Sequence, residues 1–240
     1  MRLHLVILAT SYYNLIKERA NDMGLPVLIV GKSGSGKSTS MRNFGHDEIA
    51  LINVARKALP FKGKFDSQMD TDNYTTIQAG LKQTAKKSIV IDDAGYLITN
   101  FFMRNHSGNN KGNGVYALYN QLADDFWNLI EWTKTTLPED KIVYFMMHED
   151  KNDFGDVKPK TIGKLLDDKV CIEGLFTIVL RAMSEGGEHK FRTQTDGADV
   201  AKSPIGLFDS EEIDNDLKYV DEQIRAYYEM PPLTDEKGDK

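Results

Sequence analysis

The sequence has little cysteine, because Cys171 is the only one among its 240 residues. One thiol cannot form a disulfide within the chain, which excludes the small secreted domains that depend on several such bridges. This cysteine usage is typical of a reducing compartment, so we expect the protein to act in the cytoplasm. We expect Cys171 to be a small buried side chain near a strand.

Long hydrophobic runs are also missing. No stretch approaches the roughly 18 consecutive apolar residues that a membrane-spanning helix needs. The apolar run at residues 3–9 is short for a signal peptide, and polar sequence follows it at once. We therefore expect neither a membrane span nor a secretion signal. We expect residues 3–9 to form a strand or helix that packs on the sheet predicted from the rest of the chain.

The chain has no excess of positive charge. It carries 36 acidic and 30 basic residues, which give a net charge of −6. A free-standing nucleic-acid-binding protein is usually basic. Any contact with DNA would therefore come from a local patch or from the assembly of several subunits.

The composition suits one folded domain, since 40% of the residues are apolar and 28% are charged. We expect residues 1–229 to form this domain. Residues 230–240 contain two prolines and five charged side chains, so we expect a disordered polar tail. Nothing in the sequence indicates an internal repeat or a second core.

Five short apolar runs predict strands, at residues 26–30, 50–54, 88–92, 141–147 and 175–180. Their apolar residues are continuous rather than alternating, which is typical of strands buried on both faces. Helices are predicted between them at 38–44, at 74–85 with Asp72 as its cap, and at 115–135. Strands that alternate with helices predict an α/β fold of three layers, with a mainly parallel sheet in the middle.

The pattern changes after the fifth run. Residues 188–195 alternate and predict an edge strand or hairpin, followed by a turn at Asp196 and Gly197. Residues 210–228 predict a final helix with Ser210 as its cap. The segment 105–114 is rich in Asn and Gly, so we expect a mobile loop before the long helix.

One motif points directly to chemistry. Residues 31–38 are GKSGSGKS, which matches the pattern G-x-x-x-x-G-K-[ST] between a strand and a helix. Glycines let the backbone N–H groups converge on phosphate oxygens, and the helix that follows adds its positive end. The motif predicts a P-loop whose binding residues are Gly31, Ser33, Gly34, Ser35, Gly36, Lys37, Ser38 and Thr39. Lys37 should reach the β- and γ-phosphates of ATP, and Ser38 should hold Mg²⁺.

A second acidic motif follows the third strand. Asp92 and Asp93 end the run SIVIDD, as in the Walker B motif of ATPases. Asp92 is our candidate for a second Mg²⁺ ligand. Asp93 is the candidate that polarises the attacking water, although an aspartate is shorter than the glutamate found there in many ATPases.

The next strand ends at His148. In ATPases with an extra strand between the P-loop strand and the Walker B strand, a polar residue at this position senses the γ-phosphate. His148 is therefore a sensor candidate, and the alternative is a strand-end histidine with a local hydrogen bond. Glu149 follows and can contact the same water. A metal site at these residues lacks a second histidine or cysteine and is not expected.

Three basic residues after the fifth strand can complete a neighbouring subunit's site. They are Arg181, Arg192 and Lys202, and Lys202 is preferred because it follows the predicted hairpin. Such a cation stabilises charge in the transition state of phosphoryl transfer. The alternative for each is an ordinary solvated charge.

Other P-loop classes fit less well. Residues 92–95 satisfy the D-x-x-G pattern of GTPases, but HEDK stands at 148–151 in place of a guanine-reading motif. The sequence has no LSGGQ signature of transporter ATPases. It also has no arginine-rich segment to serve as the lid of a small-molecule kinase.

With these motifs the chain resembles phage-encoded RecA-like ATP-binding proteins of the AAA superfamily, which occur in recombination and replication gene clusters. The resemblance extends from about Leu25 to Tyr228. It rests on GKSGSGKST at 31–39, IDDAGYL at 91–97, VYFMMHED at 143–150, IEGLFTIVLRA at 172–182 and AKSPIGLF at 201–208. Only the two Walker motifs among these are widely shared.

The resemblance implies an ATPase that acts as a homo-oligomer on single-stranded DNA, with a phage single-strand-binding protein, in the cytoplasm of a bacterial host. It implies that Lys202 enters the neighbouring site, and that Arg104, His106 and Lys111 contact DNA from a mobile loop. One departure matters, because RecA carries a catalytic glutamate just after its second strand and residues 53–57 hold no acid here. That moves the water-activating role to Asp93 or makes hydrolysis slow.

Two other functions remain open. The protein can be an accessory ATPase switch that binds a replication protein, in the manner of a helicase loader. It can also be a nucleotide or metabolite kinase, which would transfer the phosphate to a small acceptor instead of releasing it.

Overall fold

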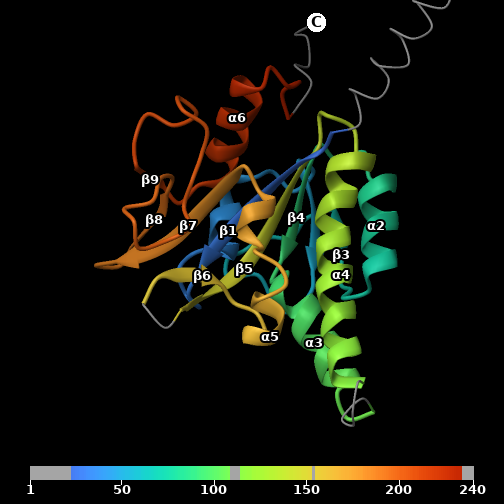
Figure 1. Ribbon diagram of the computed structural model, residues 1–240. Coiled ribbons are helices and arrows are strands. Elements are labelled where there is room, and N and C mark those ends of the chain that lie inside the picture. Colours follow the sequence, from blue (N-terminus) through green and yellow to red (C-terminus); the bar gives the residue numbers. More distant parts are fainter. Residues whose placement is uncertain (1–22, 109–113, 153–154, 234–240) are drawn as a thin grey trace, which may run out of the picture.

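The computed structural model describes residues 23–108, 114–152 and 155–233. Within them lies a nine-stranded sheet with the order β3-β2-β4-β5-β1-β7-β8-β9, and β6 pairs with the end of β5 (Figure 1). The strands are β1 (Leu25–Gly31), β2 (Ile49–Asn53), β3 (Ser67–Met69), β4 (Ser88–Asp92), β5 (Ile142–Lys151), β6 (Val157–Pro159), β7 (Ile178–Glu185), β8 (Glu188–Arg192) and β9 (Glu212–Asp214).

The central part of the sheet is parallel. β1 lies between β5 and β7, and β5 lies between β1 and β4. Strands β2 and β3 continue the parallel sheet beyond β4. This order confirms the extra strand between the P-loop strand and the Walker B strand. It also brings the carboxyl ends of β1, β4 and β5 to the same edge of the sheet.

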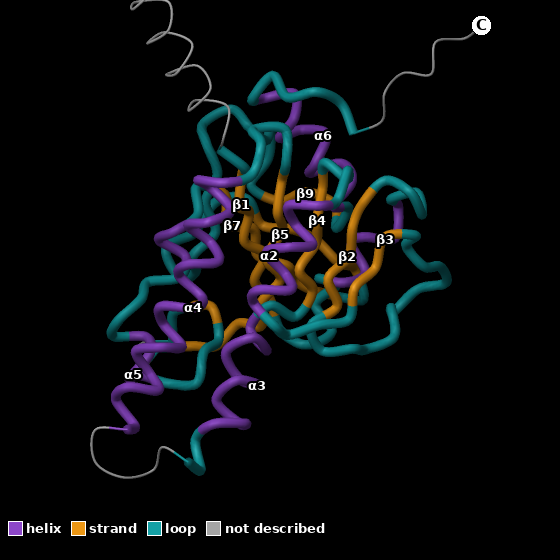
Figure 2. The backbone as a smooth tube through the Cα atoms, turned by 90° about the vertical axis from the view of Figure 1, so that its right-hand side faces the viewer, coloured by secondary structure: helices purple, strands orange, loops and turns teal. Residues whose placement is uncertain are grey.

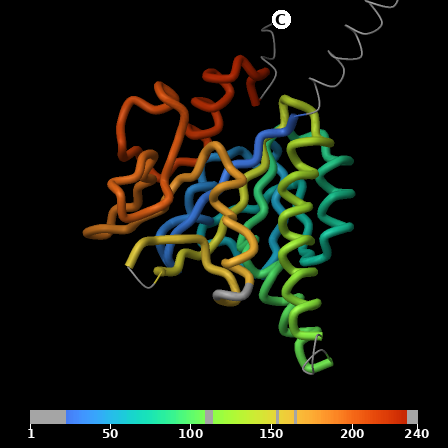
Figure 3. The backbone as a smooth tube through the Cα atoms, viewed as in Figure 1, coloured from blue at the N-terminus to red at the C-terminus, as the bar shows by residue number. Residues whose placement is uncertain are grey.

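Helices cover both faces of the sheet. The 3₁₀ helices are η1 (Ser38–Asn43) and η2 (Glu173–Leu175), and the α-helices are α2 (Tyr74–Gln83), α3 (Gly95–Asn105), α4 (Gly114–Thr136), α5 (Lys164–Asp167) and α6 (Leu217–Tyr227). Figure 2 is turned so that α2 and α4 face the viewer, and these two helices lie on the near side of the sheet. The C-terminal α6 lies far from the α3–α4 end (Figure 3).

The core follows from the alternation of side chains along the buried strands. Leu28 and Val30 of β1 face a cluster that includes Leu122 and Phe126 of α4. The intervening Val27 and Ile29 face a second cluster, which includes Met41 of η1 together with Leu217, Val220 and Ile224 of α6. A strand that is buried on both sides needs apolar residues at every position, which explains the continuous runs. The predicted three-layer, RecA-like α/β fold is confirmed, with its C-terminal hairpin and helix.

A buried polar network holds α6 to the strands. Asp221 and Arg225 of α6 form an ion pair of 2.6 Å, and their side chains are 0% and 3% exposed. Tyr144 of β5 donates a hydrogen bond to Asp221 at 2.9 Å, and Ser88 of β4 also pairs with this carboxylate. Arg225 donates to Ser88 Oγ at 2.8 Å. These groups satisfy one another, which is the condition for burying charge at tolerable cost.

Several local predictions were wrong. Asn73, not Asp72, caps α2, because its side chain accepts a hydrogen bond from the N–H of Thr76. Residues 210–228 are not one helix: β9 comes first, and α6 begins after Asp216, whose carboxylate accepts from two N–H groups of the first turn. A short strand can form there because β8 offers a free edge for β9.

Three further differences concern the second half of the chain. β7 begins at Ile178, later than the predicted run at 175–180, because η2 takes up residue 175. β8 does form a hairpin with β7, but β9 pairs with its other side, so β8 is not the edge. Cys171 is exposed, and its thiol donates to Glu173. Elsewhere along the chain, helices α3 and α5 and strands β3 and β6 were not predicted.

Some predictions fall outside the described residues. These are the strand or helix at residues 3–9, the central part of the loop at 105–114 with Lys111, and most of the tail at 230–240. Among the helices that the structure describes, none is long and apolar enough to cross a membrane.

Candidate functional site

The loop between β1 and η1 depends on its glycines. A Cβ at Gly31 would lie 2.4 Å from Ser35 Oγ and 2.6 Å from the carbonyl oxygen of Ala182, so no larger residue fits. Gly36 has a φ of 96°, in the left-handed region that favours glycine. Ser35 is buried, and its hydroxyl has no protein partner. The result is a tight turn with an unsatisfied polar atom, at the place where the sequence predicts bound phosphates.

Lys37 folds back over this loop. Its ammonium group donates to the carbonyl oxygens of Gly31 at 2.7 Å and Lys32 at 2.8 Å. Burial lowers the pKa of Lys37 to about 8, against the opposing charges of Asp93 and Asp92. The ammonium therefore lies in a buried position over the loop, held by carbonyl oxygens that a phosphate oxygen can replace.

Ser38 and Asp92 meet across the sheet. The Ser38 hydroxyl donates to the Asp92 carboxylate, at 2.8 Å to Oδ2 and 3.0 Å to Oδ1. Burial raises the pKa of Asp92, and the charge of Asp93 adds to this effect. A hydroxyl and a carboxylate are the oxygen ligands that Mg²⁺ prefers. The described residues contain no group of three or more His, Cys, Asp or Glu side chains that could hold a metal ion, so these two residues fit Mg²⁺ only with phosphate and water as further ligands.

Asp93 lies beside this pair with an unusual backbone. Its φ is 58°, in the left-handed region, which aspartate tolerates better than most residues. Its Oδ2 pairs with Lys57 Nζ at 2.6 Å, and its Oδ1 lies 3.3 Å from His148 Nε2. Burial alone would raise the pKa of Asp93, but the hydrogen bonds from His148 and Lys57 outweigh it and hold the pKa below its usual range.

His148 lies at the edge of the sheet where β1 and β4 also end. Its ring packs edge-on against Tyr96, with the ring centroids 6.0 Å apart. The structure thus brings together Lys37, Ser38, Asp92, Asp93 and His148, as the sequence predicted. The local contact with Asp93 exists, while the sensing of a γ-phosphate stays a prediction.

Sequence reasoning missed Lys57. This residue follows β2, and Asn53 fixes its backbone through two hydrogen bonds, of 2.8 and 3.2 Å. The Lys57 ammonium also lies 4.9 Å from the centre of the Tyr96 ring. Residues 53–57 hold no acid, and the lysine at the end of this segment is the signal that the sequence offers.

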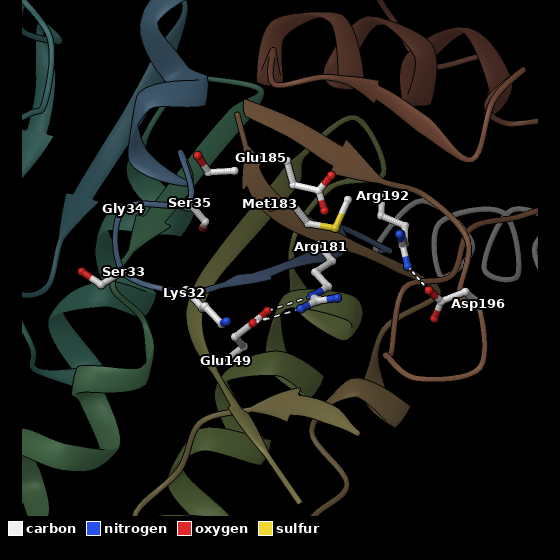
Figure 4. Close-up of a pocket in the computed structure, with 12 residues that line it drawn as sticks. Lys32, Ser33, Gly34, Ser35, Glu149, Arg181, Met183, Glu185, Arg192 and Asp196 are labelled. Carbon is white, nitrogen blue, oxygen red and sulfur yellow. Dashed lines mark hydrogen bonds and ion pairs between the residues drawn. The ribbon is translucent and has the colours of Figure 1, made fainter. Parts of the chain in front are cut away.

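A charged network links the sensor strand to the hairpin. Arg181 of β7 donates to both oxygens of Glu149, at 2.9 and 3.1 Å, and lies 3.3 Å from Asp199. Arg192 of β8 lies 3.5 Å from the same Asp199 and also pairs with Asp196. Figure 4 shows Glu149, Arg181, Arg192 and Asp196 around the cavity that they line. In this chain both arginines are held by carboxylates, and their action on a neighbouring subunit stays a prediction.

Two cavities adjoin the loop. One, of about 520 Å³, lies between Ser33–Ser35 and the end of β7, with Arg181 and Arg192 in its wall. The other, of about 510 Å³, is lined by Lys32, Ser33, Lys57, Tyr96 and His148, with Glu149 and Lys160 also in its wall. Lys32, Ser33 and Glu149 line both cavities, so the P-loop forms the ridge between them.

The remaining candidates lie elsewhere. Thr39 is half-buried in η1, directly after Ser38. Lys202 pairs through its backbone with Val179 of β7. Because Val179 pairs with Leu28, three residues before Gly31, Lys202 stands back from the edge that carries the site. Arg104 is paired with Asp72 at 2.7 Å, and the His106 ring stacks on Phe102.

The comparison with protein families supports the nucleotide-binding interpretation. A family model described as an AAA domain matches residues 23–205. Among solved structures, the chain is similar to the flagellar accessory protein FlaH from Methanocaldococcus jannaschii, with 13% identity, a TM-score of 0.38, and coverage of 82% of this chain and 88% of that chain. No curated protein matches the sequence.

Proposed function

The chain belongs to the AAA domain family, and from that membership we propose that it binds ATP with Mg²⁺ and hydrolyses ATP to ADP and phosphate. One observation carries this proposal. The contact between Ser38 and Asp92 places a hydroxyl and a carboxylate next to the loop that Lys37 closes. These residues together can bind both phosphate and a metal ion, which a glycine-rich turn alone cannot do.

In the proposed reaction, the backbone N–H groups of residues 31–39 hold the phosphates. Lys37 exchanges the carbonyl oxygens of Gly31 and Lys32 for the β- and γ-phosphates. Ser38 and Asp92 hold Mg²⁺, which neutralises part of the phosphate charge when bound. Asp93 accepts a proton from the water whose oxygen attacks the γ-phosphorus, the bond to the β–γ bridging oxygen breaks, and ADP and phosphate leave. His148 monitors the γ-phosphate from its place beside Asp93.

We further propose that the protein acts as a homo-oligomer on single-stranded DNA, in phage recombination or replication, in the cytoplasm of the bacterial host. Support comes from the position of α3 and the start of α4, which project beyond the edge of the sheet where β1, β4 and β5 end (Figure 1). A segment there can couple DNA to the nucleotide site. Lys202 stands away from its own site, as expected of a residue that acts on a neighbour. In this proposal residues 1–229 form one domain and residues 230–240 a polar tail.

The test is ATP turnover with and without single-stranded DNA, with particle mass measured in the same samples. We expect DNA to increase turnover and particle mass, and we expect DNA binding to weaken steeply as salt increases. If saturating DNA leaves both turnover and mass unchanged, the DNA part of the proposal is wrong. ATP turnover without any DNA response would leave the ATPase part standing.

An accessory ATPase that binds a replication protein is the second candidate. The net charge of −6 and the pairing of Arg104 with Asp72 favour it, because both weaken the attraction to DNA. Capture of a replication protein from solution without DNA would distinguish it from the first candidate.

A further inference from the structure

The cation beside the proposed water-activating residue has no role in the mechanism above. Lys57 contacts Asp93 Oδ2 at 2.6 Å, while His148 Nε2 lies 3.3 Å from Oδ1. Each oxygen of the Asp93 carboxylate therefore faces a nitrogen of the protein. In this arrangement both carboxylate oxygens of Asp93 are engaged by Lys57 and His148.

The backbone of Lys57 is held in place, whereas its side chain can change conformation. Asn53, at the end of β2, binds both the N–H and the carbonyl oxygen of Lys57. The Lys57 side chain, by contrast, is 56% exposed and is held by Asp93 and by the face of Tyr96. A lysine has a long flexible stem that ends in a compact charge, so a small rotation carries the ammonium group to a new partner.

The cavity beside Lys57 adjoins the P-loop, where the proposed triphosphate binds. It is lined by Ser33 of the loop, by the sensor candidate His148, and by the cations Lys32, Lys57 and Lys160. Its one acid, Glu149, is already bound to Arg181 through both of its oxygens. The charge of Lys57 also acts on the Lys37 ammonium, which places the two lysines within electrostatic reach of each other. A cavity with this charge favours an anion over a neutral group.

We propose that Lys57 is a further catalytic residue, whose ammonium group leaves Asp93 when ATP binds and contacts the γ-phosphate. A triphosphate with one Mg²⁺ keeps a net negative charge, and it competes for Lys57 more strongly than a single carboxylate does. The transfer does two things at once. It adds a cation where charge develops in the transition state, and it frees Asp93 Oδ2 for the attacking water. Lys57, in the segment after β2, then supplies a positive charge that oligomeric ATPases often receive from a neighbouring subunit.

This inference rests on the proposed function, because it needs ATP in the site. The test compares ATP and ADP affinities by calorimetry, with Mg²⁺, for the wild type and for Lys57→Met and Lys57→Arg. Lys62→Met is the matched control, since it removes one exposed positive charge from the same loop. We expect Lys57→Met to weaken ATP binding about tenfold and leave ADP binding unchanged, because only ATP has a γ-phosphate. Lys57→Arg should retain part of the preference for ATP, and Lys62→Met should retain all of it.

Turnover supplies the second measurement. We expect Lys57→Met to slow ATP hydrolysis about a hundredfold. If Lys57 only positions Asp93, turnover falls but the ratio of ATP to ADP affinity stays at the wild-type value, and the proposal is overturned. An equal loss of affinity for both nucleotides, or the same loss in Lys62→Met, overturns it as well.

The two proposals fail in different ways. A wild-type protein that prefers ATP over ADP but releases no phosphate would contradict the proposed hydrolysis, and the affinity ratio would still decide the role of Lys57. A wild-type protein that binds neither nucleotide would overturn both.

Discussion

Ser38 and Asp92 are hydrogen-bonded although their strands are not neighbours. Ser38 follows the loop after β1, Asp92 ends β4, and β5 runs between these two strands. The loop and the start of η1 reach across the end of β5, so the hydroxyl lies 2.8 Å from the Asp92 carboxylate. This contact joins into one site the two motifs that the sequence shows far apart.

Replacing Lys37 with alanine should abolish nucleotide binding. The ammonium group is the buried cation of the loop, and its loss removes the charged partner that the P-loop gives to the phosphates. We expect the affinity for ATP to fall by about two orders of magnitude or more in calorimetry. Lys64→Ala, at an exposed position, is the control and should bind normally. Unchanged affinity in Lys37→Ala would remove the basis for the P-loop assignment.

Replacing Asp93 with asparagine should separate binding from hydrolysis. The amide keeps the shape of the side chain but cannot take a proton from water, so ATP should still bind. Turnover should fall by about a hundredfold or more, as expected for loss of a general base. The measurement is phosphate release at saturating ATP, with Asp124→Asn on the exposed face of α4 as control. Turnover at the wild-type rate would refute the role proposed for Asp93.

Lys202 can be tested by mixing subunits. If Lys202 acts on a neighbour, Lys202→Ala subunits keep an intact site but lack the incoming cation. Lys37→Ala subunits have an inactive site but still carry Lys202. We expect the mixture to recover part of the ATPase activity that each variant lacks alone. As a control, mixing Lys202→Ala subunits with subunits that carry both Lys37→Ala and Lys202→Ala should recover no activity. A lack of recovery in the first mixture would count against sharing between subunits.

The Asp221–Arg225 pair should dominate the stability of α6. Arg225→Met leaves Asp221 buried without its cation, so we expect a loss of about 3–5 kcal/mol in the free energy of unfolding. Adding Asp221→Asn should restore part of this loss, because the uncompensated charge is then gone. Lys218→Met breaks a more exposed ion pair on the same helix and should cost about 1 kcal/mol or less. Urea denaturation measures all three, and similar losses in the two single variants would contradict the prediction.

His46 should make stability depend on pH. Its Nδ1 lies 2.7 Å from the Asp66 carboxylate. The hydrogen bond to this carboxylate, together with its negative charge, raises the pKa of His46. A raised pKa means that the folded state binds the proton more tightly than the unfolded state. The stabilisation is therefore present below the unfolded pKa of about 6.5 and is lost as the pH rises through the higher folded value.

The variant Asp66→Asn tests this effect. We expect the difference in melting temperature between wild type and variant to be larger at about pH 6 than at about pH 9, where the stabilisation from protonated His46 is lost. The pKa of the His46 ring, followed by NMR, should be lower in Asp66→Asn. A difference in melting temperature that is the same at both pH values would show that the ion pair does not contribute.

The sequence alone determined the fold class and the core of the site. Continuous apolar runs predict strands buried on both faces, and the interleaved helices predict a parallel sheet. The P-loop and the acidic strand end are local patterns, since their geometry is set by residues a few positions apart. Once the strand order is assumed, the meeting of Lys37, Ser38, Asp92, Asp93 and His148 follows, because parallel strands end at the same edge.

Only the tertiary structure decided which charges are paired. Lys57 and Asp93 lie 36 positions apart, Arg181 and Glu149 are 32 apart, and Lys218 and Glu48 are 170 apart. Composition and periodicity describe one segment at a time, so they show a lysine or an arginine but not the carboxylate that it meets. The same limit explains why β9 was predicted as helix. A strand of three residues is stabilised mainly by the neighbouring strand with which it pairs, and that neighbour is visible only when the chain has folded.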